Sequence, residues 1–224
     1  MVTKKTLQES SKKIIQLIFL GIFVCLQSCV QNEEQPKEET KPIVEKITVQ
    51  RDGKIHIMHP HDGDLYWIFP KTKDSLGSGG ELTIYIDPEN HPRASASFAK
   101  YTMGIGGALP THKHEKTEEI AYIISGEGLA LNYVNEELIE IPIKAGYVWY
   151  NPPGVWHSFK NTGDEPLSMV FAVIPNEKTG LLSFFRKIGA EPGKEAMVLS
   201  PEEFSRLASE HDMILKPPTK IESE

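Results

Sequence analysis

Cysteine is almost absent from this chain. Only two of the 224 residues are cysteines, Cys25 and Cys29, and both lie near the N-terminus, so no disulfide bond can cross-link the rest. An excess of positive charge is also lacking, because the net charge of -7 offers nothing to the phosphate backbone of a nucleic acid. The core must therefore hold by packing alone, and nucleic acid is excluded as an expected partner.

The sequence has no apolar run long enough to favour a membrane-spanning helix. The run from Ile14 to Leu26 has 13 residues, whereas a spanning helix needs about 20. It is preceded by four lysines, and a basic region before a short apolar stretch is typical of a secretory signal peptide. We therefore expect residues 1–28 to be a signal peptide.

The end of this run resembles the lipobox of bacterial lipoproteins. In Leu26-Gln27-Ser28-Cys29 an aliphatic residue stands three positions before the cysteine and a small residue directly before it. Gln27 departs from the commonest pattern. The rival, Cys25, follows Val24 where a small residue belongs. The resemblance implies lipidation, with palmitate or a similar acyl chain, at Cys29.

Residues 29–46 have the composition of a flexible tether. Gln31 to Lys41 is rich in Glu, Lys, Gln and Pro, which cannot bury enough apolar surface to fold. We expect a domain held in the cell envelope, outside the cytoplasm, that touches the membrane only through its lipid anchor.

Residues 47–178 are expected to form one all-β domain of antiparallel strands. Short apolar runs alternate here with turn residues, and no long helix interrupts them. The runs predict strands at residues 47–50, 55–58, 65–69, 82–86, 97–103, 119–124, 128–133, 138–143, 147–150, 156–161 and 168–174.

Residues 179–224 are expected to form a helical tail. Apolar side chains recur at helical spacing from Leu181 to Ile188, just before Gly189. Ser200-Pro201-Glu202-Glu203 combines a capping serine, an early proline and a reciprocal glutamate, which predicts a second helix from Glu202 to Ser209.

Three histidines and one carboxylate have spacings that suit a metal site. His112 and His114 are two residues apart, so on a strand they face the same side. Glu119 begins the next expected strand, and His157 follows 38 residues later. Imidazole nitrogen and carboxylate oxygen suit divalent Fe, Mn, Zn, Cu, Ni or Co. Glu118 competes with Glu119, but neighbours on a strand face opposite ways, so only one can serve.

The surroundings of these residues resemble both sequence motifs of the cupin family, within residues 106–161. The motif positions are Gly106, His112, His114, Glu119 and Gly126, and then Gly146, Pro152, Gly154, His157 and Asn161. The resemblance implies a jelly-roll barrel, or double-stranded β-helix. It also implies one divalent transition metal (Fe, Mn, Cu, Ni or Zn) held by His112, His114, Glu119 and His157. The spacing to Gly126 selects Glu119 over Glu118.

An apolar pocket is expected beside this site. By alternation along a strand, Ile123 faces the same side as Glu119, and Val155 and Phe159 the same side as His157. With residues of the strand at 97–103, the expected pocket lining is Tyr101, Met103, Ile123, Val155 and Phe159. Trp149, Tyr150 and Trp156 are further aromatic candidates.

The resemblance leaves the activity open. A metal-dependent dioxygenase acting on a small chelating enol, diol or aromatic compound is one reading, and the tail is similar to that of quercetinase-like cupins. A decarboxylase, an isomerase, or a non-catalytic module that binds or senses a small molecule or sugar are alternatives. No catalytic acid or base is assigned. Cupins commonly pair, so a homodimer is expected, with residues 47–50 as a candidate exchanged strand.

The five other histidines are not expected to form a site. His59 and His61, with His56, belong to a turn around Pro60 and Asp62-Gly63. His91 and His211 stand alone in the sequence, and we expect both to be exposed to solvent.

Overall fold

The structure is a computed structural model, and it describes residues 57–217. The expected signal peptide, Cys29, the tether and the strand at 47–50 lie outside the described residues. The strand expected at 55–58 lies partly outside them, and residues 57 and 58 form no strand.

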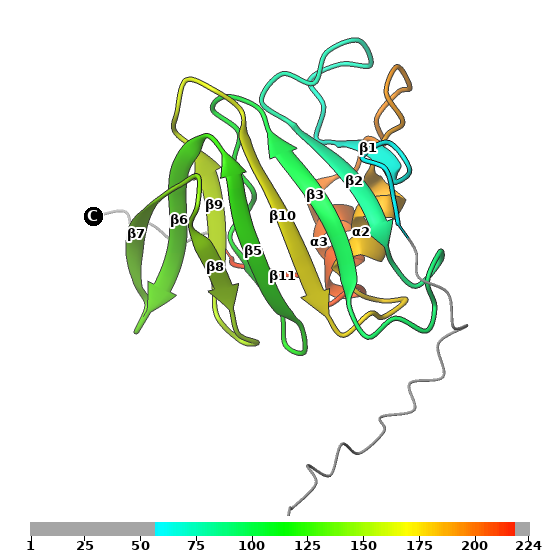
Figure 1. Ribbon diagram of the computed structural model, residues 1–224. Helices are drawn as coiled ribbons and strands as arrows, with labels where there is room; N and C mark the ends of the chain where they lie inside the picture. The colour runs from blue at the N-terminus through cyan, green and yellow to red at the C-terminus, as the bar shows by residue number, and fades with distance from the viewer. Residues whose placement is uncertain (1–56, 218–224) are drawn as a thin grey trace, which may run out of the picture. The chain divides into compact units, whose positions relative to one another are not determined.

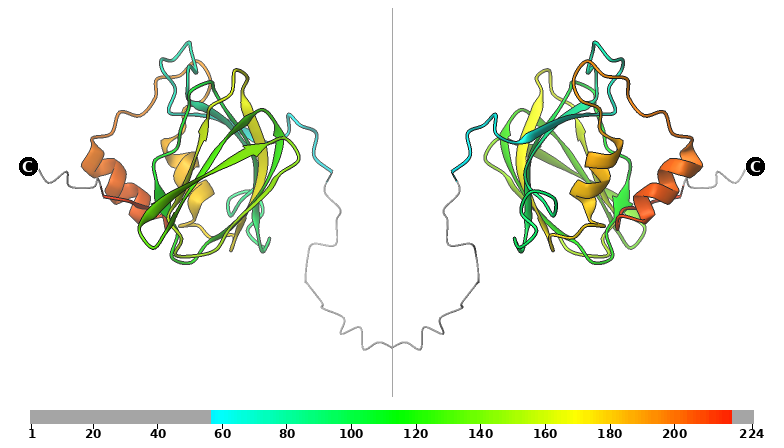
Figure 2. Two further views of the ribbon diagram at one scale, coloured as in Figure 1. Left: turned by 90° about the vertical axis from the view of Figure 1, so that its left-hand side faces the viewer. Right: turned by 90° about the vertical axis from the view of Figure 1, so that its right-hand side faces the viewer.

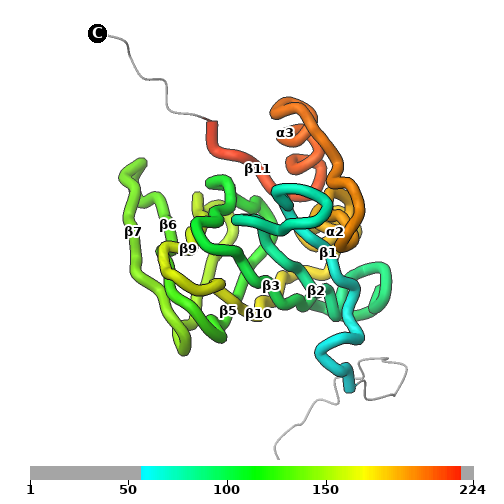
Figure 3. The backbone as a smooth tube through the Cα atoms, turned by 90° about the horizontal axis from the view of Figure 1, so that it is seen from above, coloured from blue at the N-terminus to red at the C-terminus, as the bar shows by residue number. Residues whose placement is uncertain are grey.

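Two antiparallel sheets curve toward each other around a common interior, and Figures 1 and 3 show this arrangement. The larger sheet has the order β1-β2-β3-β10-β5-β8 and the smaller one β11-β4-β9-β6-β7. This confirms the expected all-β jelly-roll. The strands are β1 (Asp64–Ile68), β2 (Gly80–Ile86), β3 (Ser97–Met103), β4 (His112–Lys113), β5 (Glu118–Ser125), β6 (Glu127–Val134), β7 (Glu137–Lys144), β8 (Val148–Asn151), β9 (His157–Asn161), β10 (Leu167–Ile174) and β11 (Ile214–Leu215).

The core lies between the sheets and follows from period-two alternation. On β3, the alternate residues Ser97, Ala99, Tyr101 and Met103 are buried, while Phe98, between the first two, is exposed. β10 pairs with β3 on one side and β5 on the other, so its buried residues complete the same interior. Apolar side chains that leave water in this way supply the main stabilisation, at about 25 cal/mol per Å² of buried area.

Two helices follow the strands, as the sequence predicts. In α2 (Leu181–Ile188) the five apolar residues are buried, and Figure 2 shows this helix packed against the strands. On its other face, Arg186 donates hydrogen bonds to Asp87 at 2.8 Å, Tyr66 at 3.0 Å and Asp64 at 2.7 Å. These bonds tie the helix to β1 and to the end of β2.

α3 (Pro201–Ser209) begins with the predicted capping box. The Glu203 amide donates to the Ser200 hydroxyl, and the Ser200 amide donates to the Glu203 carboxylate. The tail then continues into β11, a two-residue strand too short for its pattern to be read from the sequence. Over the described range, no helix has both the length and the apolar character that crossing a bilayer requires.

Asn161 joins β9 to the end of β3. Its side-chain nitrogen donates to the carbonyls of Met103, Gly104 and Glu165 at 2.9 to 3.2 Å, and its oxygen accepts from the Gly163 amide at 3.0 Å. The side chain is fully buried. This second-motif residue therefore fixes the strand that carries His157.

We expect Asn161→Ala to lower the free energy of unfolding by about 2 to 3 kcal/mol, because buried carbonyls would lose their donor. Thermal unfolding followed by circular dichroism should show a midpoint lower by about 5 to 10 °C. Thr162→Ala, one residue away at an exposed position, is the matched control. An equal midpoint in the two variants would contradict this role for Asn161.

Candidate metal centre

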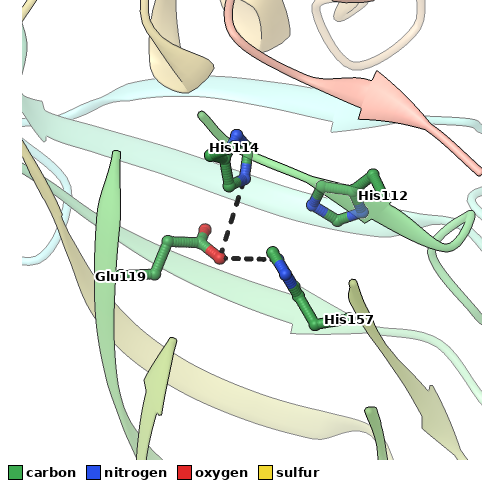
Figure 4. A group of neighbouring side chains, drawn as sticks. All are labelled: His112, His114, Glu119 and His157. Carbon is green, nitrogen blue, oxygen red and sulfur yellow. Dashed lines mark ion pairs between the residues drawn. The ribbon is translucent and has the colours of Figure 1, made fainter. Parts of the chain in front are cut away.

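The barrel brings the four expected ligands together. His112 lies on β4 and pairs directly with His157 at the start of β9. His114 follows β4, and Glu119 is the second residue of β5. Figure 4 shows the four side chains pointing toward one point, and one ligand atom from each lies within 4.8 Å of all the others. No other such group of three or more His, Cys, Asp or Glu residues occurs within residues 57–217.

The cluster is enclosed and contains a close contact between ligand atoms. The three histidines are at most 2% exposed, and the Glu119 side chain is 14% exposed. Glu119 Oε2 lies 3.0 Å from His157 Nε2 and 3.8 Å from His114 Nε2 (Figure 4).

Backbone carbonyls set the tautomer of each histidine. The Nδ1 atom of His112 contacts the Pro110 carbonyl at 2.7 Å, that of His157 the Val155 carbonyl at 2.8 Å, and that of His114 the Asp212 carbonyl. A carbonyl only accepts hydrogen bonds, so each Nδ1 carries a hydrogen, and Nε2 is the atom on which a neutral ring has its lone pair.

These lone pairs fit a metal ion. The Nε2 atoms of His114 and His157 are buried and have no hydrogen-bond partner among the described residues. With His157 in its neutral form, the 3.0 Å contact to Glu119 places two lone-pair atoms face to face. A buried arrangement of this kind is unfavourable until a cation lies between the two atoms. Three imidazole nitrogens and one carboxylate oxygen suit Fe, Mn, Cu, Ni or Zn.

The protonation states also suit a metal. Burial lowers the pKa of His112 to about 3, and the nearby His157 and His114 lower it further. Burial raises the pKa of Glu119, but a hydrogen bond from the His157 ring and the positive charge that the neighbouring imidazoles carry when protonated outweigh this effect, so its pKa lies below the usual value. At neutral pH, His112 is neutral and Glu119 is charged, which are the forms that bind metals.

The structure also separates Glu119 from Glu118. The Asn151 side chain donates to Glu119 Oε2 at 3.2 Å, on the cluster side of β5. Glu118 instead accepts a hydrogen bond from the exposed Tyr150 hydroxyl at 3.3 Å. Glu119 is therefore the carboxylate that reaches the histidines.

A small cavity of about 30 Å³ adjoins the cluster. Its walls include His112, Glu119 and His157, apolar residues of both sheets, and Leu181 and Phe185 from α2. Tyr101 is the only titratable residue in the wall besides the three ligands, and burial raises its pKa, so its hydroxyl stays protonated at neutral pH.

The cavity corrects part of the expected lining. Tyr101 and Phe159 line it, as does Trp149. Met103 and Ile123 do not: they are buried elsewhere in the core. Ile123 shares a face with Glu119 but lies four residues, or about 13 Å, further along the strand.

Val155 does not line the cavity either, because it lies in the loop before β9 and is half-buried there. Of the further aromatic candidates, Tyr150 is exposed and Trp156 lies beside Lys113 and Lys216. Alternation along a strand gives the face of a residue but not its depth. The sequence contains no pattern that would predict residues of α2 in the cavity wall.

The remaining histidines lie apart from this cluster. His59 and His61 are exposed, and His56 lies outside the described residues. The expectation that His91 and His211 are exposed is wrong. His91 is half-buried, and its ring contacts the side-chain oxygen of Asn90 at 2.7 Å. His211 is 8% exposed, because its Nδ1 bonds the Leu207 carbonyl within the tail and its ring packs on Phe184.

We expect the metal-free protein to lose stability as the pH falls from about 6.5, the value for an unfolded histidine, toward 3. The unfolded chain binds a proton at His112 in this window and the folded chain does not, so the free energy of unfolding falls by up to about 1.4 kcal/mol per pH unit. Urea unfolding with a chelator present should show a shallower pH slope for His112→Gln than for the parent. His59→Gln, at an exposed position, should keep the parent slope, and parallel curves for all three proteins would refute the assignment.

Comparison with known proteins gives one consistent family. Residues 99–173 match the Cupin domain family. The oxalate-binding protein of Thermotoga maritima is 36% identical over 94 residues, which are 42% of this chain and 74% of that protein. Germin-like protein 5-1 of Oryza sativa subsp. japonica is 28% identical over 90 residues, 39% of each chain.

Solved structures include a predicted oxalate decarboxylase from Thermotoga maritima. It is 28% identical, with a TM-score of 0.44, over 54% of this chain and 99% of that one. The two sheets, the four converging side chains and the aligned Thermotoga maritima sequence together show that this chain belongs to the cupin family.

Proposed function

We propose that the protein binds one divalent transition metal through His112, His114, Glu119 and His157, and through it a small chelating oxygen anion of the oxalate class. The observation that carries this proposal is the convergence of the four side chains, with the buried Nε2 atom of His157 only 3.0 Å from Glu119 Oε2. A relative that is 36% identical is described as an oxalate-binding protein, which supports the choice of ligand.

The size of the cavity supports a small ligand. Four protein ligands leave about two positions open on a six-coordinate ion. Two oxygen atoms of one small molecule fill adjacent positions. A cavity of about 30 Å³ holds only a few atoms, so a flavonol-sized molecule would require the cavity wall to move. Size therefore favours a small dicarboxylate or enol over the larger aromatic substrates.

The cavity wall supplies a neutral donor and no cation. Among the described residues, no lysine or arginine lines it. Trp149 does, and its indole Nε1 is buried without a hydrogen-bond partner within residues 57–217. The metal would balance the charge of the anion, and the Trp149 N–H would donate to an oxygen of the anion that faces away from the metal.

An oxygen-dependent oxidase or dioxygenase is the second candidate function. The apolar wall, which includes Leu109, Met169 and Phe171, suits dioxygen. Tyr101, protonated at neutral pH, offers no general base. Bound iron, manganese or copper would supply redox chemistry. The tail similar to that of quercetinase-like cupins agrees with this candidate. A decarboxylase or an isomerase would be distinguished from an oxidase or dioxygenase by the products of the reaction.

We also propose that the domain is carried as a lipoprotein of the cell envelope. The basic region, the short apolar run and Ser28-Cys29 support export and lipidation. A diacylated cysteine with a third, amide-linked chain anchors a protein stably, unlike a single acyl chain. The homodimer expected for a cupin stays a prediction.

We expect the purified chain to carry about one equivalent of a transition metal, measured by plasma mass spectrometry. The double variant His112→Ala, His157→Ala should lose it. Isothermal titration calorimetry should show oxalate binding to the metal-loaded parent and none to the metal-free protein. Oxygen uptake with oxalate or a small enol would favour the second candidate, and product release without oxygen would favour a decarboxylase.

Trp149→Phe tests the proposed hydrogen bond from Trp149 to the ligand. It should keep the metal and weaken oxalate binding about tenfold, the effect of one lost hydrogen bond. A parent without metal, even after reconstitution, would reject the proposal. A parent that binds metal but not oxalate would reject only this ligand class.

We expect Cys29→Ser to abolish incorporation of labelled palmitate when the full chain is expressed in a bacterial host. The thiol of Cys29 is the proposed acceptor, whereas Cys25→Ser should be labelled like the parent. Gel fluorography of the membrane fraction distinguishes the two variants. Labelling of Cys29→Ser at the parent level would contradict the anchor.

A further inference from the structure

One metal-site histidine depends on a residue far away in the sequence. His112 and His157 each contact a backbone carbonyl two positions earlier in their own segment. The Nδ1 atom of His114 instead contacts the carbonyl of Asp212, which is 98 residues away in the helical tail. Of the three rings, only that of His114 is oriented by the tail.

The Asp212 side chain binds the same loop. Its Oδ1 accepts a hydrogen bond from the Glu115 amide at 2.9 Å. Its Oδ2 accepts from the Lys116 amide at 3.1 Å and from the Thr117 hydroxyl at 2.8 Å. This loop links His114 to the strand that carries Glu119, so one residue holds the connection between two ligands.

The backbone at Asp212 has a conformation that is unusual for a residue other than glycine. Its φ is 57°, in the left-handed region, which aspartate tolerates better than most residues. Such a conformation persists where the surroundings fix it. Here the flanking residues do so, because His211 and Met213 are buried and the Met213 amide donates to the Ala208 carbonyl at 3.0 Å.

The strand after Asp212 is also attached to the metal-site segment. Ile214 pairs with Lys113 and Leu215 with His112, and the Lys216 amide donates to the Thr111 carbonyl at 2.9 Å. The tail therefore lies against the first two ligands along its last residues, and Asp212 has a fixed place relative to His114.

We propose that Asp212 is a positioning residue whose carboxylate holds the loop between His114 and Glu119, so that its carbonyl meets the His114 ring, and that it thereby sets the affinity and coordination geometry of the metal centre. The effect on the metal rests on the proposed function, whereas the effect on the His114 ring does not. Residues that orient a ligating histidine typically change metal affinity about 10-fold to 100-fold when they are replaced.

Asp212→Gly tests the carboxylate while glycine keeps the left-handed backbone available. In the full chain, with Co²⁺ as the probe, we expect the dissociation constant from chelator competition to rise about 10-fold to 100-fold. The visible absorption bands of bound Co²⁺ should shift, because the site would lose its fixed geometry. Asp212→Asn retains one acceptor oxygen and should give an intermediate affinity.

Glu210→Gln is the control, because Glu210 lies in the same tail and pairs only with Arg206 among the described residues. It should match the parent in affinity and spectrum. Parent-like Co²⁺ affinity and an unchanged spectrum in Asp212→Gly would overturn the inference, while leaving the metal site intact.

A measurement without metal separates this inference from the proposed function. In the metal-free parent, nitrogen NMR of the imidazoles should show the His114 hydrogen fixed on Nδ1, and Asp212→Gly should give a mixture of tautomers. If both proteins give the same His114 signals, the Asp212 carboxylate does not position the ring, because the backbone carbonyl is present in both. If the parent binds no Co²⁺ but the NMR difference is present, the proposed function fails and the positioning role stands.

Discussion

Each metal-site histidine uses its Nδ1 hydrogen on a backbone carbonyl, and the chemistry of the site depends on these three contacts. They leave the three Nε2 atoms facing a carboxylate within a buried space. Acceptors without donors are unfavourable in such a place. The cluster is thus buried and contains a neutral His112 and a charged Glu119, which are the protonation states that bind a cation.

The rest of the barrel holds the four side chains at this point. β4 and β5 are consecutive in the chain but belong to different sheets, and β9 arrives from the other motif. The pairing of His112 with His157 and of Glu119 with Asn151 fixes the ligands across strand boundaries. Asn161 then fixes the far end of β9 with bonds to three carbonyls. Because its residues come from strands that are far apart in the sequence, the cluster depends on the closure of the whole barrel.

Much of this arrangement could be predicted from the sequence, because strands, capping boxes and glycine turns are local signals. The alternation in β3 and the capping box at Ser200 gave their elements almost residue for residue. The depth of side chains could not be predicted, since Met103 and Ile123 have the correct face but lie away from the cavity. A contact between residues 98 positions apart, such as that from His114 to Asp212, leaves no periodic pattern in the sequence, so it could not be predicted. The same holds for the burial of His211.

The tail also changes what counts as one unit of this protein. The family match ends at residue 173, yet the carbonyl that orients His114 is at Asp212 and the strand that pairs with His112 ends at Leu215. A fragment cut at the family boundary would keep all four ligands and lose part of their support. For grafting, domain fusion or comparison with shorter cupins, the transferable module of this chain accordingly extends through the C-terminal strand.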